Sequence, residues 1–275
     1  MAHYKIRLLV FVPPMRSILR ALLILMVAAL PLRAQIGGPP GGNAQNDAAT
    51  VTAACLARLN ATAVRDITLR GRARFGPNTA EIPVTLVATP DGSYRIDFAT
   101  GAVKSEVFTA SDAGRAGWID LSGTVHELPR HVALAAAPWF SPALAMLSRI
   151  QSTRGTLSET AGPSTAATVQ VVLARSTGSN TRAQAVTQRL TAITVVIDRH
   201  NHLPFRLKFD SHPNETSRVD IPTEVTFSDY RNVAEIPTPF HIEKRMNGGL
   251  VLEINVDEAL VNSGARVSPL EGGAQ

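Results

Sequence analysis

The last quarter of the sequence alternates apolar and polar residues with a period of two. Residues 203–209 place Leu and Phe between Arg and Lys, and residues 240–256 repeat this pattern on both sides of Asn247-Gly248. A period of two puts apolar side chains on one face of a β-strand and polar ones on the other. Asn-Gly between two such runs predicts a tight hairpin. We therefore expect a curved antiparallel sheet, preceded by a buried strand at residues 190–197.

Shorter apolar runs upstream predict further strands of the same sheet. Turn signals, such as residues 90–92, separate them about every 8–12 residues, which is typical of a curling antiparallel sheet rather than of βαβ units. The predicted strands are Ile67–Phe75, Ile82–Thr89, Tyr94–Phe98, Val103–Thr109, Gly117–Leu121 and Thr168–Ala174. Arg70, Arg72 and Arg74 share one face of the first strand. We interpret that face as solvated, with contact to lipid head groups or to the acidic residues of a partner as the alternative.

Two segments have the composition and spacing of helices. In residues 47–61 apolar residues fall four apart and share one helical face. Residues 132–150 are rich in Ala, Leu and Met, and Ser141-Pro142 within them predicts a break and a new helix start. This apolar pair of helices is either a core element that plugs the sheet or a mobile lid over a cavity.

The remaining segments are predicted to lack regular structure or to fray. Residues 153–166 and 175–188 are polar and are predicted to be loops. Residues 259–275 are expected to form a short helix that ends in a frayed tail.

Turn and strand motifs near the C-terminus carry a resemblance to a known family. The motifs are Phe227-Ser-Asp-Tyr-Arg-Asn-Val, Ile236-Pro-Thr-Pro-Phe-His-Ile, Asn247-Gly and the turn from Asp198 to Leu203-Pro204. This stretch resembles the end of the LolA/LolB-like periplasmic lipoprotein carriers. The predicted order of helices and strands is similar over roughly the whole secreted part, whereas the residues themselves are similar only in its last third. It implies a half-open antiparallel β-barrel closed by helices, with an apolar cavity for acyl chains.

These observations predict one α+β domain. Its strongly curved antiparallel sheet, a half-open β-barrel, has helices packed on or lidding the concave face. The predicted parts are a signal peptide at residues 1–34, a flexible Gly/Pro linker at 35–46, the LolA-like domain at 47–262 and a disordered tail at 263–275.

The N-terminal residues have the pattern of a secretory signal. Arg16 and Arg20 precede a short apolar run that ends near residue 30, and small residues follow. We predict cleavage near Ala34-Gln35 and a periplasmic location. A retained membrane anchor is the alternative, and Met15 begins a more typical leader than Met1 does.

The net charge gives no support for nucleic-acid binding. The chain has 27 basic and 22 acidic residues, and residues 1–34 hold five of the basic ones and none of the acidic ones. The rest is therefore balanced, with 22 of each sign, so no basic surface for phosphate backbones is expected.

The sequence lacks the motifs of the common catalytic sites. His126 and His131 are five residues apart, about 140° around a helix, whereas a zinc-protease motif needs a spacing of four. Asp198, His200 and His202 share one turn, which favours an ordinary polar hairpin over a metal cluster. No Gly-x-Ser-x-Gly elbow occurs. Neither a metal nor a cofactor nor catalysis is predicted.

The single cysteine, Cys55, is predicted to be a small buried side chain. Thr52-Ala53-Ala54 before it loosely echoes a lipidation box, but the apolar run that such a box needs ended far upstream. Lipidation or thiol reactivity is the alternative.

The predicted ligand-binding residues form one apolar row together with the central aromatic pair of the helical segment. They are Ile96, Phe98, Trp139, Phe140, Phe205, Leu207, Val225, Phe227, Phe240, Ile242 and Leu252. The leading hypothesis is a monomeric carrier that holds the acyl chains of a lipid or lipoprotein. An envelope sensor or interaction module with a protein partner is the alternative, and a hydrolase using scattered histidines is the weakest one. The row is equally compatible with a filled core.

Overall fold

The computed structural model describes residues 43–99, 103–109, 115–136, 138–152, 160–161, 165, 167–175, 181–268 and 270. All of them belong to one compact unit, Pro40–Gln275. The predicted signal peptide and residues 35–42 of the predicted linker lie outside the described residues. The first helix begins at Asn43, inside the predicted linker.

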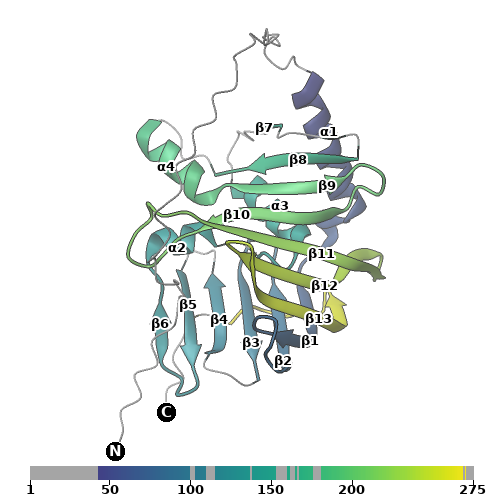
Figure 1. Ribbon diagram of the computed structural model, residues 1–275. Helices are drawn as coiled ribbons and strands as arrows, with labels where there is room; N and C mark the ends of the chain where they lie inside the picture. Colours follow the sequence, from purple (N-terminus) through teal and green to yellow (C-terminus); the bar gives the residue numbers. More distant parts are fainter. Residues whose placement is uncertain are drawn as a thin grey trace, which may run out of the picture. The chain divides into compact units, whose positions relative to one another are not determined.

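A single antiparallel sheet of 13 strands dominates the described part of the chain (Figure 1). Its spatial order is β6-β5-β4-β3-β2-β1-β13-β12-β11-β10-β9-β8-β7, with β6 and β7 at the two edges. The strands are β1 Ile67–Arg74, β2 Ile82–Ala88, β3 Tyr94–Phe98, β4 Val103–Thr109, β5 Arg115–Asp120, β6 Val125–Glu127, β7 Thr160–Ala161, β8 Thr168–Leu173, β9 Ile193–Asp198, β10 Pro204–Ser211, β11 Ile221–Val233, β12 Ile236–Met246 and β13 Gly249–Val261.

The pairing of β1 with β13 joins the two halves of the sheet. Each half is a meander in which strands that are neighbours in sequence are neighbours in space, and at this seam two strands that lie far apart in the sequence pair. The register shifts between Arg70 and Gly71. A Cβ atom at Gly71 would lie 2.0 Å from the carbonyl oxygen of Asn255, so the two backbones approach as closely as they do because residue 71 lacks a side chain.

The helices lie on the concave side of the sheet and complete the core. They are α1 Asn43–Arg58, the 3-10 turn η1 Ala61–Ala63, α2 Arg130–Ala135, α3 Pro142–Ser152 and α4 Thr181–Thr191. Helix α2 contacts both β5 and β10, which are far apart in the strand order, so the sheet curls around it. Figure 1 shows the result: β8 to β11 run across the view and β1 to β6 run down it.

One continuous apolar core fills the space between the two halves of the sheet, β1–β6 and β7–β13, which are called its two arms below. It includes Leu86 and Ile96 from one arm, Val171 and Val195 from the other, and Leu144 of α3 between them. No helix of the described residues combines the length and the apolar character needed to cross a membrane.

The predicted fold class is confirmed, and the helix pair at residues 132–150 appears as α2 and α3. Three local predictions are wrong. Within the predicted loop at residues 153–166, Thr160–Ala161 form the edge strand β7, because they pair with β8. Residues 181–191, within and just beyond the other predicted loop, form α4, because Arg, Ala, Gln and Leu are good helix formers even where the segment is polar. Residues 259–261 belong to β13 rather than to a helix, because β1 supplies their hydrogen-bonding partner. The described residues that follow, 262–268, contain no helix, and Leu270 is buried against Ile119.

Candidate functional site

A small cavity on the concave side, beneath α2, is lined by several polar side chains. Its volume is about 130 Å³. Both arms of the sheet and the segment from α2 to α3 contribute walls. The lining residues are Tyr94, Glu106, Ala116, Leu128, Val132, Ala135, Ala136, Trp139, Phe209, Ser211, His212 and Lys244. Eight of these twelve are apolar or uncharged aromatic residues, so the cavity is a mainly apolar space with a few polar groups, as in ligand sites generally.

Lys244 occupies a position of the apolar face of β12. Its neighbours across the strands are Val225 and Leu252, both buried in the core. Burial lowers the pKa of the Lys244 ammonium, while the charge of Glu106 acts in the opposite direction. The ammonium lies over the Trp139 ring, 4.6 Å from its centroid. Among the described residues none accepts a hydrogen bond from Lys244, so this cation is only partly compensated.

The opposite wall carries a buried phenol and a carboxylate. The Tyr94 hydroxyl donates to Glu106 Oε1 at 3.0 Å. Burial, with a smaller contribution from the Glu106 charge, raises the pKa of Tyr94 well above its usual value, so the phenol remains a neutral donor. Its ring packs edge-on against Phe140, with centroids 5.7 Å apart. Glu106 points to the concave side because its cross-strand neighbour is the buried Ile96.

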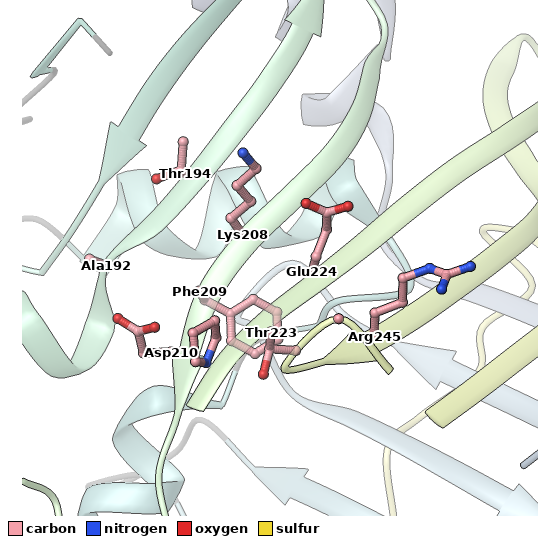
Figure 2. A pocket seen from close by; sticks show the side chains of 10 residues that line it. Ala192, Thr194, Lys208, Phe209, Asp210, Thr223, Glu224 and Arg245 are labelled. Atoms are coloured by element: carbon pink, nitrogen blue, oxygen red, sulfur yellow. The ribbon is translucent and has the colours of Figure 1, made fainter. Parts of the chain in front are cut away.

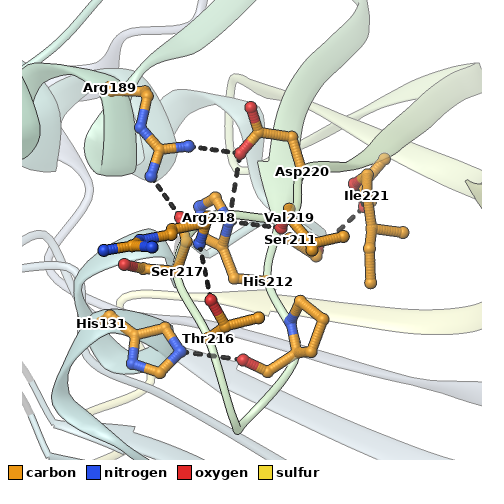
Figure 3. Close-up of polar contacts among 12 residues, drawn as sticks. His131, Arg189, Ser211, His212, Thr216, Ser217, Arg218, Val219, Asp220 and Ile221 are labelled. Atoms are coloured by element: carbon orange, nitrogen blue, oxygen red, sulfur yellow. Dashed lines mark hydrogen bonds and ion pairs between the residues drawn. The ribbon is translucent and has the colours of Figure 1, made fainter.

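Two further polar atoms of the cavity walls are buried without a hydrogen-bond partner. They are Trp139 Nε1 and His212 Nε2. The other ring nitrogen of His212, Nδ1, lies 3.1 Å from the Val219 carbonyl and 3.3 Å from Asp220 Oδ1 (Figure 3). Because both neighbours are acceptors, Nδ1 carries a hydrogen and donates to them. Buried polar atoms normally have partners, so these two mark the cavity as a site for a ligand or water.

The loop between β10 and β11 holds His212 in place. Arg189 of α4 donates to Asp220 Oδ1 at 2.5 Å and to the carbonyl oxygen of Ser217. Figure 3 shows these contacts converging on the loop around the His212 ring. The histidine is therefore fixed by backbone and side-chain contacts on its Nδ1 side, and its other edge faces the cavity wall.

Helix α2 covers the cavity. It has six residues, Arg130–Ala135, and Pro129, the residue before it, provides no side-chain cap. His131 Nε2 donates to the carbonyl oxygen of Pro213 at 2.8 Å, which ties α2 to the β10–β11 loop (Figure 3). At the other end, Arg149 Nη2 of α3 donates to the Ala136 carbonyl at 2.7 Å. Short, weakly capped segments of this kind open at lower free energy than the sheet beneath them.

The structure places ten of the eleven predicted ligand-binding residues in the buried core and brings one of them, Trp139, to the cavity wall. Phe205 does not join that core. The register of β10 shifts between Pro204 and Arg206, and the Tyr230 hydroxyl donates to the Pro204 carbonyl at this bulge. The bulge removes Phe205 from the period-two row, a change that sequence alternation alone does not reveal.

The polar residues of the cavity were not singled out from the sequence, although one signal was present. Lys244 stands between Ile242 and Met246 in the row that faces the core, and a lysine in an apolar row is unusual. Glu106 and His212 gave no comparable signal, because their position depends on how the two arms of the sheet meet.

The histidine pairs considered from the sequence are not brought together. His126 Nε2 lies 3.0 Å from Asp120 Oδ2, and its ring stacks on the Trp118 ring with centroids 3.8 Å apart. His131 instead forms a hydrogen bond with the β10–β11 loop. In the turn after β9, Asp198 Oδ1 accepts from the backbone of His200 at 2.7 Å. Within the described residues no group of three or more His, Cys, Asp or Glu side chains is arranged to hold a metal ion.

Cys55 is fully buried on α1. Its Sγ lies 3.9 Å from the Met146 sulfur of α3. Burial raises the pKa of the thiol to about 12, so the thiolate needed for nucleophilic chemistry does not form at neutral pH.

A larger hollow of about 370 Å³ lies near the start of β9 and β11 and the turn at Gly248. Figure 2 shows Thr194, Lys208 and Glu224 pointing to the same side of neighbouring strands. Charges of opposite sign alternate there, and Glu224 also lies 3.5 Å from Arg206. This open and self-compensated surface lacks the unpaired buried groups of the concave cavity, which is therefore the better candidate site.

Solved structures share this fold, although sequence comparisons find no relative: no family model and no curated protein matches the chain. A domain from Vibrio parahaemolyticus named for outer membrane lipoprotein sorting has a TM-score of 0.53 at 10% identity, covering 81% of this chain and 95% of that one. A DUF1329 family protein from Desulfovibrio piger has a TM-score of 0.50 at 8% identity, with coverage of 82% and 94%. A LolA superfamily protein from Nitrosomonas europaea gives 0.44 at 12% identity, with coverage of 75% and 91%. The chain therefore shares its fold with the lipoprotein-sorting domain and the DUF1329 protein, in agreement with the half-barrel predicted from its turn motifs.

Proposed function

We propose that this chain is a periplasmic carrier that holds the acyl chain of a lipid or lipoprotein between the two arms of its sheet, without catalysis. The observation that carries the proposal is the concave cavity itself, where a LolA-like half-barrel leaves apolar walls and unpartnered polar atoms beneath a short helix. The likeness to a domain named for lipoprotein sorting supports it. The predicted signal peptide, with cleavage near Ala34-Gln35, would deliver the chain to that compartment.

The size of the cavity requires that the carrier open to load its ligand. Sites for small molecules usually have volumes of roughly 300 Å³ or more, whereas this cavity has about 130 Å³. In this proposal the structure represents a closed state, which has room for a head group or a short part of a chain. Displacement of α2 would enlarge the cavity, and it would require breaking the bond from His131 to Pro213 and exposing the buried side chain of Ala133.

In this proposal the apolar row becomes the binding surface when α2 moves. Trp139 already lines the cavity, and Leu207, Val225 and Ile242 lie in the adjoining core. Each methylene of a bound chain that leaves water contributes about 0.8 kcal/mol. Part of this gain offsets the free energy needed to open the core.

The test is native mass spectrometry of the full-length gene product, exported and purified from a bacterial periplasm without detergent. Co-purifying lipid, or uptake of added fatty acid or lipopeptide, is the expected result. Ala135→Leu narrows the cavity and should reduce uptake, whereas Val186→Leu on the exposed face of α4 should not. A protein that remains ligand-free with every added amphiphile would show that the row is a filled core and the carrier proposal is wrong.

A further inference from the structure

We propose that Lys244 and Trp139 form a subsite for the negatively charged oxygen head group of a single-chain amphiphile, a carboxylate or a phosphate, in the cavity beneath α2. This inference rests on the proposed carrier function and specifies its ligand. A head group at this position would make the carrier selective among amphiphiles of equal chain length.

The first argument is the charge of Lys244, which is half-buried and has no hydrogen-bond acceptor among the described residues. A buried cation is costly unless an opposite charge or hydrogen-bond acceptors compensate it. Lys244 stands between the core residues Val225 and Leu252, and its one short compensating contact among the described residues is with the face of the Trp139 ring, while Glu106 acts on it at longer range. A bound anion would supply the missing acceptor in a place where water competes poorly.

The second argument is that the nearby carboxylate does not fill this role. Glu106 lines the same cavity, but its Oε1 accepts from the Tyr94 hydroxyl at 3.0 Å, and it forms no ion pair with Lys244 among the described contacts. Its charge reaches Lys244 only at longer range. The negative charge of Glu106 therefore weakens the attraction of Lys244 for an anion, but it does not take the place of a bound anion. Neutralising Glu106 should strengthen anion binding.

The third argument is the second unpartnered donor. The indole N–H of Trp139 is buried, lacks an acceptor and belongs to the side chain that Lys244 contacts. An oxygen anion has enough lone pairs to accept from both groups. The remaining walls, among them Leu128, Val132 and Phe209, are apolar and suit the first methylenes of the tail.

Binding of three probes with the same twelve-carbon chain tests the subsite: laurate, dodecyl phosphate and dodecanol. The full-length chain carries a Trp118→Phe background, so that Trp139, the other of the two tryptophans, reports binding through its fluorescence. The variants are Lys244→Met, which removes the cation, and Glu106→Gln, which keeps an acceptor for Tyr94. Lys208→Met on the outer surface is the matched control.

The proposal predicts that Lys244→Met weakens the binding of laurate and of dodecyl phosphate about tenfold or more, which is the usual effect of losing a charge-assisted hydrogen bond. Lys244→Met should change the binding of dodecanol little. The Lys208→Met control should bind all three probes as the parent does, and Glu106→Gln should bind both anionic probes more tightly. A preference for only one of the two anions identifies which head group the subsite takes.

Two other results would overturn the proposal, and they are distinguishable. Equal binding of all three probes, unaffected by Lys244→Met, would contradict the subsite and leave the acyl-chain carrier standing. Absence of binding by any probe, with unchanged circular dichroism and melting temperature, would contradict the carrier function itself and the subsite with it.

Discussion

The ammonium of Lys244 lies 4.6 Å from the centroid of the Trp139 ring, and this contact joins the sheet to its helical cover. Lys244 comes from the concave face of β12, whereas Trp139 comes from the segment between α2 and α3. A cation over an indole ring contributes roughly 0.5–2 kcal/mol, depending on desolvation. That is less than the usual cost of burying a charge, so the pair is better explained by function than by stability.

The first prediction is that Lys244→Met stabilises the ligand-free protein. Burial lowers the Lys244 pKa, which means that the folded state disfavours the charged form. Methionine fills a similar volume without a charge, so the free energy of unfolding should rise by about 0.5–2 kcal/mol at pH 7. Urea denaturation of the parent and the variant measures the change.

The pH dependence of this difference has a defined sign. A lowered folded-state pKa means that the unfolded state binds more protons, so the Lys244 penalty fades as pH rises from the lowered pKa toward 10.5. The advantage of Lys244→Met over the parent should therefore shrink at alkaline pH. A variant that is less stable than the parent at pH 7 would show that the Trp139 contact outweighs the desolvation of the cation.

The second prediction concerns Cys55 at alkaline pH. Burial raises its thiol pKa from 9.0 to about 12, so the folded state keeps the proton after the unfolded state has lost it. The resulting stability is fully present below pH 9 and is lost as pH rises toward 12. Between pH 8 and 10 the loss should be about 1.4 kcal/mol.

Chemical denaturation across this pH interval measures the loss, with Cys55→Ala as the control that lacks it. Thiol-reactive reagents should label the parent only as fast as it unfolds, because the folded thiol is both buried and protonated. Rapid labelling under native conditions, or equal pH dependence in Cys55→Ala, would contradict the burial of this side chain.

Local patterns in the sequence were sufficient to predict most of the sheet. The alternation from Phe240 to Val256 and the Asn247-Gly248 turn correspond to β12, β13 and their hairpin. The polar helix α4 was missed, because its buried positions are few and its polarity is that of a loop. The end of β13 was missed as well, since its strand character depends on pairing with β1, almost 200 residues away.

The candidate site was harder to predict than the fold. Lys244 and Glu106 come from strands β12 and β4 and His212 comes from the β10–β11 loop, and these segments meet only when the sheet has curled around α2. No local pattern encodes that convergence. The apolar row was visible in the sequence, but alternation alone separates neither core from cavity nor a bulged position such as Phe205 from its neighbours.

The third prediction is that His131→Ala loosens α2. This removes the bond from His131 Nε2 to the Pro213 carbonyl and should reduce stability by about 1 kcal/mol. Stopped-flow uptake of a fluorescent fatty acid should become faster, because α2 covers the cavity. His126→Ala is the matched control, since His126 bonds to Asp120 and stacks on Trp118 outside the cavity lining. Uptake rates that are equal in both variants would exclude α2 as the cover.

The fourth prediction addresses the seam that joins the two halves of the sheet. Asp66, just before β1, is buried, and its carboxylate accepts from the backbone of Ser263 at 2.9 Å, from the Ser263 hydroxyl at 2.8 Å and from the backbone of Gly264 at 3.0 Å. These bonds fix the chain where it leaves β13. Because Ser263 and Gly264 are exposed, water can replace part of what is lost.

Asp66→Ala should therefore cost about 1–3 kcal/mol, the range for charge-assisted hydrogen bonds, measured by urea denaturation at pH 7. Asp66→Asn keeps one oxygen acceptor and should cost less. Hydrogen exchange should show the loss concentrated in β1 and the end of β13, because the seam is where segments distant in sequence pair. Exchange that accelerates evenly over all strands would mean instead that the seam opens only when the whole domain unfolds.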